Sequence, residues 1–353
     1  MNLALVEKIA GAVLYEGYIL YPYRPSAVKN QQRWNFGALC PQSYSEAQRG
    51  TESWTMQTEC LVEGSGDATL DVKVRFLHLA SREVQAFVPG SGFRPVPQLE
   101  VNGRLHQTWQ EAAEREVSLP SLNLGETISE PQRLTFSFPA GREIELLCDE
   151  ASGQTLGRIH RAQQSIEGAV EVTAGEAREG LLKISVRILN LTALEAAGRK
   201  SRDEALMRSF VSTHTILGAR GGEFVSLLDP PEAAREAAAL CQNVGTYPVL
   251  VGEEGARDCL LSSPIILYDY PQIAPESAGD LFDGTEIDEI LTLRIMTLTD
   301  EEKREMRGAD ERARRILERT ETLPAEQLMK MHGAMRSLRP KEKGKGQTAG
   351  GNE

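Results

Sequence analysis

The sequence predicts an α+β fold, with a β-rich antiparallel body and a C-terminal helical appendage. The segments between Trp54 and Leu228 alternate apolar and polar residues with a period of two, as in "DATLDVKVRFLHLA". Turn residues such as "EGSGD" separate several of these segments. After Asp280 the apolar residues recur at helical spacing among dense charge, which is typical of surface helices.

The expected body begins with a helix over Leu3–Ala12 that leads into a strand over Val13–Tyr21. Trp54–Val62 and Ala68–Ala80 are predicted to be paired strands, because turn residues lie between them. "RLTFSFP" and "EIELLCDE", separated by "AGR", have hairpin-like spacing. "AVEVTAGEAREGLLKISVRILNLT" predicts strand, loop and strand, and "SFVSTHTILGARGGEFVSLLDPP" repeats that style with a Gly-Gly turn.

Helices are expected to interrupt the strands at His106–Val117, Arg202–Ser209 and Pro231–Gln242. The last of these has proline and glutamate in its first turn, where both favour a helix start. Strands are predicted to follow at Tyr247–Val251 and Leu260–Tyr270.

The C-terminal region predicts several helices. Thr299 and Glu302 have the spacing of a capping box, which marks a helix start. Pro324 restarts a further helix over Ala325–Leu338. One apolar stripe is expected along the single capped helix "TDEEKREMRGADERARRILERTE", formed by Met306, Ala309, Ala313, Ile316 and Leu317.

The expected organisation is a body over residues 1–280, C-terminal helices over 281–338 and a disordered tail over 339–353. The tail, "RPKEKGKGQTAGGNE", has almost no apolar residues to bury, so it is expected to stay unfolded. A division of the body into two subdomains, with a break near 120–160, is left open.

The composition of the 353 residues is ordinary for a globular protein, with 41% hydrophobic residues and a formal net charge of -12. An acidic chain argues against general binding to nucleic acids or anionic membranes, which relies on clustered Lys and Arg. No apolar run reaches the roughly 18 residues that a membrane span needs. The N-terminal segment lacks the features of a signal peptide, so we expect a cytoplasmic protein without a membrane span.

No cofactor or metal site is predicted from the spacing of cysteines and histidines. The five cysteines never form C-x-x-C, and no H-x-x-x-H or H-E-x-x-H pair occurs among the five histidines. A metal site assembled from distant residues stays open at this point. The sequence also lacks the phosphate-binding glycine loops and the G-x-S-x-G elbow, so no catalytic residue is assigned.

The densest group of candidate binding residues lies in "YPYRPSAVKNQQRWNFG", Tyr21–Gly37. Aromatic rings beside arginine are typical of protein interfaces, while cations beside a hydroxyl could hold a carboxylate or phosphate. A proline-rigid corner packed on the core is the third interpretation, and the residues alone leave all three open. The candidates are Tyr21, Tyr23, Arg24, Ser26, Lys29, Asn30, Arg33, Trp34 and Asn35.

A second candidate region echoes the first. "ILYPYRP" and "ILYDYPQIAP" both place Tyr-x-Tyr and a proline-containing loop after an apolar run, which suggests two loops that lie side by side. The second loop is acidic and could pair with the basic first one. A contact would then use the Tyr21–Gly37 and Tyr268–Glu289 loops. The candidates in the second loop are Tyr268, Asp269, Tyr270, Glu276 and Asp283.

Two further hypotheses compete with a partner interface. The first is an enzyme that binds a small anionic substrate with Arg24, Lys29 and Arg33 and uses an acidic residue such as Asp269 as acid or base. The second is an oligomeric scaffold, with homo-oligomers formed through the C-terminal helices.

Two stretches resemble a known group of proteins. They are "LYPYRPSAVKNQQRWNFG" and "SSPIILYDYPQIAPESAGDLFDGTEIDEILTLRIMTLTDEEKREMRGADERARRILERTETLP". They resemble uncharacterised accessory proteins encoded beside uptake nickel–iron (NiFe) hydrogenase subunits and their maturation factors in aerobic bacteria. The resemblance implies a cytoplasmic role in hydrogenase assembly, maturation or stabilisation. It implies binding to a hydrogenase subunit or maturation factor, for which Tyr23, Arg33 and Trp34 are the expected anchors.

Overall fold

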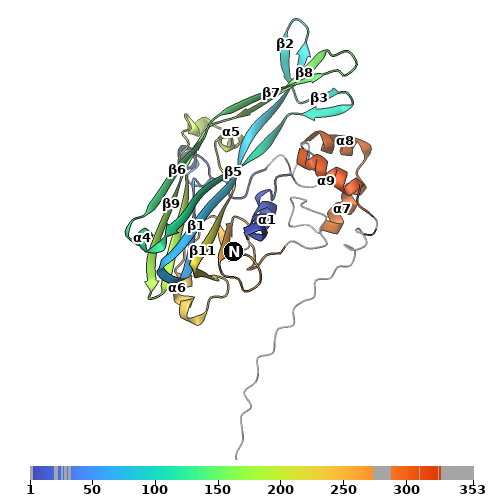
Figure 1. The fold of residues 1–353 in the computed structure, drawn as a ribbon. Helices are drawn as coiled ribbons and strands as arrows, with labels where there is room; N and C mark the ends of the chain where they lie inside the picture. The colour runs from blue at the N-terminus through green and yellow to red at the C-terminus, as the bar shows by residue number, and fades with distance from the viewer. Residues whose placement is uncertain are drawn as a thin grey trace, which may run out of the picture.

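The computed structural model describes residues 3–19, 23–24, 27, 30, 33–272, 288–309, 311–324 and 326. Within these ranges an antiparallel sheet of eleven strands carries helices from both chain ends on one side (Figure 1). This arrangement confirms the predicted α+β class, with a β-rich antiparallel body and helices near the C-terminus. No helix in the described ranges is long and apolar enough to cross a membrane.

A single strand of 34 residues, β1 (Thr55–Val88), runs along the whole sheet (Figure 1). One edge of β1 pairs in turn with β10 (Leu181–Asn190), β5 (Trp109–Asn123) and β2 (Gly92–Val96), and the other with β11 (Val211–Val225) and β8 (Thr155–Gln163). The expected pair of strands joined by "EGSGD" is therefore wrong. The chain shifts register between Gly64 and Thr69 instead of reversing. A Cβ at Gly64 would lie 3.1 Å from the Gly222 Cα of β11, so glycine permits this close approach.

The remaining strands extend the sheet on both sides. β9 (Ile166–Arg178) and β10 form the expected hairpin, and β12 (Tyr247–Leu250) pairs with β13 (Cys259–Ser263). The predicted hairpin of β6 (Gln132–Phe138) with β7 (Gly141–Cys148) is wrong, because β6 pairs with β9 and β7 with β8. β11 likewise passes through its Gly-Gly pair as one strand.

The main core lies where the sheet curls over itself. Phe76 of β1 is fully buried, and its ring centroid lies 6.0 Å from that of Phe136 on the distant strand β6. Phe210 completes this cluster, 4.7 Å from Phe76 and 5.4 Å from Phe136. Aromatic contact at these distances stabilises the curl beyond the burial of apolar area alone.

The predicted helix at His106–Val117 is wrong. These residues belong to β4 (Arg104–Gln107), which forms a small separate sheet with β3 (Gln98–Val101), and to β5. β5 is rich in helix-forming Ala and Glu, but it pairs with β1 along nearly its whole length, and this pairing overrides local preference. The smaller helices are α3 (Gln42–Ala47), α4 (Leu124–Ser129), α5 (Arg202–Leu206), α6 (Arg235–Ala239) and the 3₁₀ turns Ala197–Arg199 and Glu232–Ala234.

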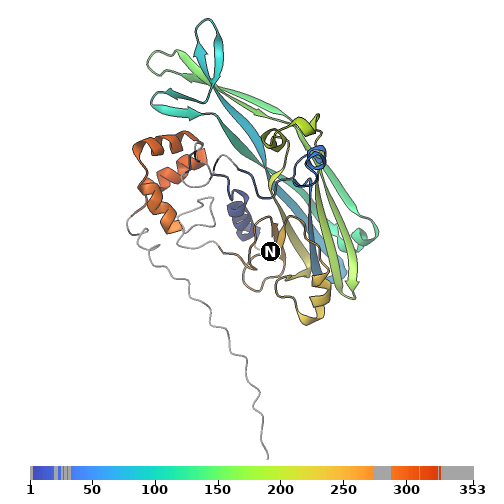
Figure 2. The same ribbon diagram turned by 180° about the vertical axis from the view of Figure 1, so that it is seen from behind.

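A second core joins the two ends of the chain. The helix α1 (Leu3–Leu14) ends in a turn, so the described part of the expected strand Val13–Tyr21 is not a strand. α1 lies between the sheet and the C-terminal helices, as Figures 1 and 2 both show. Tyr15 and Tyr18 are buried in the same cluster as residues of these helices, and Arg312 lies 4.0 Å from the centroid of the Tyr15 ring.

The C-terminal helices are α7 (Asp288–Met296), α8 (Asp300–Ala309) and α9 (Glu311–Glu321). The capping box is confirmed, because the Glu302 carboxylate accepts from the Thr299 amide at 2.9 Å and Glu302 N donates to the Thr299 hydroxyl at 3.2 Å. The whole predicted apolar stripe is buried against the body. The expected helix Ala325–Leu338, apart from Glu326, and the tail 339–353 lie outside the described residues.

Candidate functional site

The structure describes part of each predicted loop. From the first loop it describes Tyr23, Arg24, Asn30, Arg33, Trp34 and Asn35, and from the second Tyr268, Asp269 and Tyr270. The candidates Tyr21, Ser26, Lys29, Glu276 and Asp283 lie outside the described residues.

An aromatic cage encloses the guanidinium of Arg33. Its central carbon lies 3.9 Å from the Trp109 ring centroid, 4.3 Å from that of Trp34 and 5.0 Å from that of Tyr18. Arg33 donates to the Gln110 carbonyl at 2.7 Å, and the Trp34 indole donates to the Gln110 side chain at 3.2 Å. Cation–π contacts of this kind stabilise a buried arginine.

The cage leaves little of the surface of the expected anchor residues accessible to a partner protein. Tyr23, Arg33 and Trp34 are all buried, as is Asn30. Most of their surface therefore already contacts the chain itself, as expected for the packed-corner interpretation. On the folded chain, a partner would reach only the edges of these side chains.

Three of the predicted aromatic residues have strained backbones. Tyr23, Trp34 and Tyr270 have φ values of 56°, 65° and 56°, in the left-handed region that bulky residues rarely adopt. Arg202 donates to the carbonyl of Trp34 at 3.0 Å and to that of Arg33 at 3.2 Å. The Arg202 guanidinium is itself held by Glu52 at 2.7 Å. We call these contacts of Arg202 the Arg202 brace, and they hold the backbone at Trp34 in its strained conformation.

The charged candidates do not converge. Arg24 pairs with Glu302 at 3.3 Å and Glu305 at 3.6 Å, both on α8. The Asp269 carboxylate instead accepts from the Ser226 hydroxyl at 2.5 Å and from the Leu250 amide at 2.8 Å. Arg24 and Asp269 therefore do not pair, and the described part of the acidic loop is tied to the end of β12.

The first predicted loop meets the segment just before the second one. A Cβ at Gly37 would lie 2.8 Å from Pro264, and Gly37 has a φ of +54°, so both close approach and conformation require glycine. We call Asn35–Gly37 together with Pro264–Tyr268 the loop junction. Three of its large apolar side chains are exposed, Phe36 by 44%, Ile266 by 72% and Tyr268 by 84%, whereas Ile265 and Leu267 are half-buried.

A pocket of about 520 Å³ adjoins the cage. We call β2, β7, β8 and the end of β1 the arm (Figure 1). Residues of β1 and β8 line the pocket, which places it at the base of the arm. Its walls are polar and aromatic, formed by Asn30, Arg33, Trp34, Ser81, Arg82, Glu83, Thr108, Trp109, Gln110, His160, Ala162 and Asp203. Arg82 donates to the Ala309 carbonyl at 2.6 Å, so this cation also holds α8 on the body.

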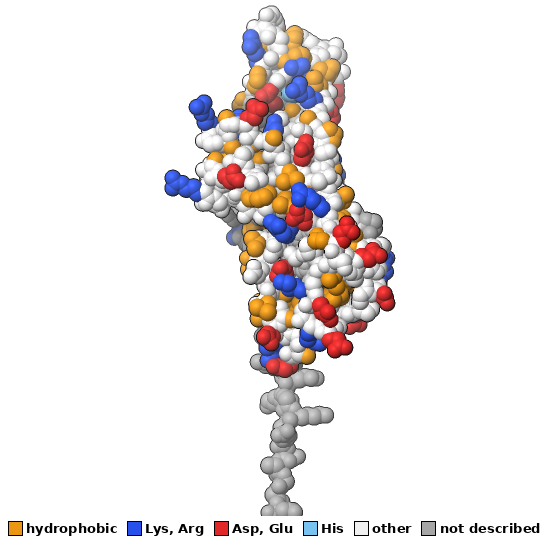
Figure 3. All heavy atoms as spheres, turned by 90° about the vertical axis from the view of Figure 1, so that its left-hand side faces the viewer, with side chains coloured by type: hydrophobic (Ala, Val, Ile, Leu, Met, Phe, Trp, Pro, Cys, Tyr) orange, Lys and Arg blue, Asp and Glu red, His pale blue; other side chains and the backbone are white. Residues whose placement is uncertain are grey.

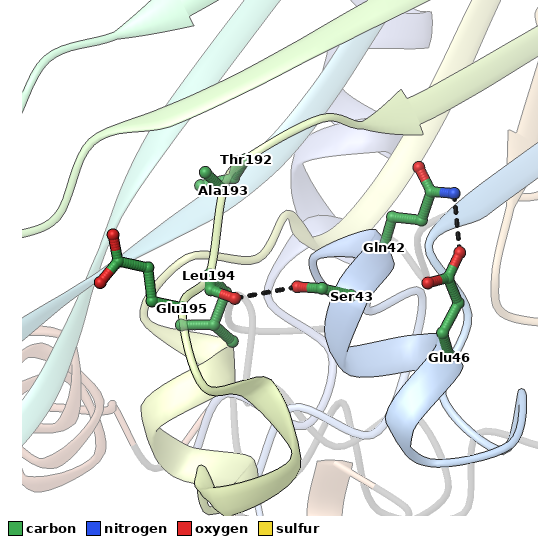
Figure 4. Close-up of a pocket in the computed structure, with 7 residues that line it drawn as sticks. All are labelled: Gln42, Ser43, Glu46, Thr192, Ala193, Leu194 and Glu195. Carbon is green, nitrogen blue, oxygen red and sulfur yellow. Dashed lines mark hydrogen bonds between the residues drawn. The ribbon is translucent and has the colours of Figure 1, made fainter.

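The pocket does not assemble the predicted anion site. Arg33 lines it, but its guanidinium is enclosed by rings. Arg24 and Asp269, the other described residues of the enzyme hypothesis, are not among the lining residues. A second depression of about 380 Å³ lies between α3 and residues 192–195 (Figure 4). There Glu195 points away from α3, and Glu46 accepts from Gln42 at 2.9 Å.

Sequence reasoning missed several residues of this region. Phe36 and Ile266 stand in the quoted stretches, where their apolar character was a usable signal. Trp109, Gln110 and Arg202 are remote in sequence, and their partnership with Arg33 and Trp34 has no local signature. Among known proteins, no family model and no curated sequence matches the chain.

Proposed function

We propose that the chain is an accessory binding protein that holds another protein at the loop junction. The observation that supports this most is the exposure of Phe36, Ile266 and Tyr268 where two distant parts of the chain meet. Exposed apolar area costs about 25 cal/mol per Å², and burial under a partner recovers that free energy. Aromatic side chains on a rigid support are the usual anchors of protein interfaces.

The partner follows from the resemblance of the two stretches to proteins encoded beside uptake NiFe hydrogenases. A hydrogenase subunit or maturation factor is the proposed partner, in the cytoplasm. The role is assembly, maturation or stabilisation of the hydrogenase. The apolar junction on a chain of net charge -12 fits a partner that offers an apolar recess surrounded by basic residues.

Affinity purification from a hydrogen-oxidising culture tests this proposal. The tagged wild-type chain should recover hydrogenase subunits or maturation factors, and the Ile266→Ser/Tyr268→Ser variant should recover at least about tenfold less, the loss expected for interface anchors. Leu240→Ser is the matched control, because Leu240 is 66% exposed on another part of the surface. Equal recovery by both variants, with intact folds, would contradict the junction as the binding site.

One observation favours a homo-oligomer through the C-terminal helices as a second candidate. Ile290, Leu293 and Met296 are exposed along α7, where their spacing places them on one face. The stripe of α8 and α9 is already buried within the chain, so among the described C-terminal helices α7 is the one that offers an exposed apolar face to an oligomer. Sedimentation of a Leu293→Ser/Met296→Ser variant tests this, since a mass unchanged from an oligomeric wild type would exclude α7.

A further inference from the structure

The strand β7 is an open edge of the sheet. Among the described strands it pairs only with β8, and it runs along the outer margin of the arm, away from α8 and α9 (Figure 1). Along one of its edges, backbone N–H and C=O groups have no strand partner. Such an edge is a template on which another chain can add a strand.

The other described edges of the large sheet either contain proline or expose no large aliphatic side chain, whereas β7 combines exposed charges with exposed aliphatic residues. β2, β5 and β12 contain Pro95, Pro120 and Pro248, and proline removes a donor from the edge. β6 turns its apolar residues inward and exposes Arg133, Thr135 and Ser137. β7, "GREIELLC", has no proline and exposes two large aliphatic side chains.

These aliphatic residues lie on one face of the arm. Ile144 is 55% exposed and Leu146 is 58% exposed, and their two-residue spacing places them side by side. Ile144 is directly opposite His160 of β8, which also lines the pocket. Apolar, basic and acidic side chains are interspersed on the arm in the view of Figure 3. The exposed face of β7 therefore continues into the pocket wall.

The opposite face of β7 is acidic. Arg161 is shared among three carboxylates, at 2.9 Å from Glu111, 2.9 Å from Glu145 and 3.6 Å from Glu143. The Glu143 side chain is 71% exposed. A cation opposite Glu143 or Glu145 on an added strand would gain a favourable cross-strand pair.

We infer that β7 docks an extended segment of a partner protein as an added β-strand. The segment alternates aliphatic residues, which pack on Ile144 and Leu146, with Lys or Arg, which face Glu143 and Glu145. The inference rests on the proposed function in that both make the chain a binding protein, but it concerns a different surface. The backbone supplies the hydrogen bonds, and the alternating side chains supply the specificity.

A second copy of this chain is a poor occupant of the edge. In antiparallel self-pairing centred on Glu143, Ile144 or Glu145, a glutamate of one copy lies opposite a glutamate of the other. Like charges directly opposite each other destabilise a strand pair. A segment with cations on that face is the complementary partner.

Synthetic peptides with the purified full-length chain test the inference. Two capped peptides of about eight residues, one alternating Lys with Val and one alternating Glu with Val, match the length of a strand. Fluorescence anisotropy should show binding of the Lys–Val peptide at least about tenfold tighter than that of the Glu–Val peptide. Hydrogen exchange should slow at the amides of β7.

Methylation of the peptide backbone distinguishes strand addition, which needs backbone hydrogen bonds, from electrostatic attraction alone. Peptides methylated only on the valine amides or only on the lysine amides each lose the donors of one edge. One of the two should lose binding and the other should keep it. Equal effects of both methylations, binding without charge preference, protection away from β7, or no binding at all would overturn the inference.

Charge reversal provides the matched variants. Glu143→Lys/Glu145→Lys should reverse the preference between the peptides, while Glu176→Lys/Glu179→Lys, the same change at the exposed β9–β10 turn, should leave it intact. Preference unchanged in the first variant would contradict the inference. The peptides replace the natural partner, so this result does not depend on whether that partner is a hydrogenase component.

Discussion

Arg202 donates a hydrogen bond of 3.0 Å to the carbonyl of Trp34, which stands 168 residues earlier in the chain. The same guanidinium reaches the carbonyl of Arg33, and Glu52 holds it in place. Through this contact α5 fixes the residues just before Phe36, and so fixes the position of Phe36 in the loop junction. The exposed Phe36 side chain thus stands on a support that is already ordered within the chain, which would lower the entropic cost of the binding proposed at the loop junction.

Arg202→Ala should lower the free energy of unfolding by about 2–3 kcal/mol, because two carbonyl bonds and an ion pair are lost together. Urea unfolding monitored by tryptophan fluorescence measures the change. Arg199→Ala, at an exposed site in the adjacent 3₁₀ turn, should change stability by less than about 0.5 kcal/mol. Equal effects of the two substitutions would show that the brace contributes nothing.

Arg33→Lys should destabilise the chain by about 1–3 kcal/mol even though it keeps the charge, because lysine lacks the planar guanidinium that stacks between Trp34 and Trp109. The free energy of unfolding is the measurement. Arg133→Lys is the control, since the Arg133 side chain is 51% exposed on β6. An Arg33→Lys substitution that left the free energy of unfolding unchanged would contradict the stacking of the guanidinium in the aromatic cage.

Gly308→Ala should destabilise the docking of α8 by about 1–3 kcal/mol, because the new Cβ would lie 2.4 Å from the Leu105 carbonyl oxygen of β4. Hydrogen exchange across α8 measures the loss. Gly11→Ala, in α1 with open space around it, should stabilise the chain by about 0.5–1 kcal/mol. If Gly308→Ala also stabilised the chain, α8 would not sit against β4 as described.

The chain should lose stability in mild acid. Burial lowers the pKa of His78, His106 and His214 to about 4, whereas an unfolded histidine titrates near its ordinary value of 6.5. Between pH 4 and pH 6.5 the unfolded chain binds more protons than the folded chain. The stability that the three neutral histidines contribute is therefore complete above pH 6.5 and declines as the pH falls towards 4.

Urea unfolding at a series of pH values between about 7.5 and 4.5 measures this dependence. His214→Gln should flatten the slope by up to about 1.4 kcal/mol per pH unit, because one titrating group is removed. A free energy of unfolding that stayed constant or rose as the pH fell through this range would contradict the buried neutral histidines.

The sequence predicted best where local pattern decides the structure. Thr299 and Glu302 lie within one helical turn, so the capping box could be read directly. The stripe from Met306 to Leu317 was identifiable by its period. The β9–β10 hairpin followed from alternation and a short turn.

Prediction from the sequence failed where the residues in contact lie far apart in the chain. Gly64 and Gly66 look like a turn, yet β1 continues through them because β11 approaches closely. β5 looks helical until its pairing with β1 is known. Strand pairing is decided by tertiary contacts that propensity does not contain.

The proposed binding region was only partly predictable from the sequence. Gly37 of the first predicted loop contacts Pro264, which precedes the second predicted loop, so the side-by-side arrangement suggested by the Tyr-x-Tyr echo stays a prediction. The roles of the aromatic residues within them could not be assigned, because Trp34 and Tyr268 have the same interfacial chemistry. Trp34 is 5% exposed and Tyr268 is 84% exposed, and only the fold distinguishes them.

Photo-crosslinking at position 268 in hydrogen-oxidising cells tests the central proposal most directly. A benzophenone amino acid in place of Tyr268 should form a covalent adduct with a hydrogenase subunit or maturation factor, identified by mass spectrometry. The same group in place of Leu240, which is also exposed, should form none. Absence of that adduct at 268, or equal adducts from both positions, would contradict binding of a hydrogenase component at the loop junction.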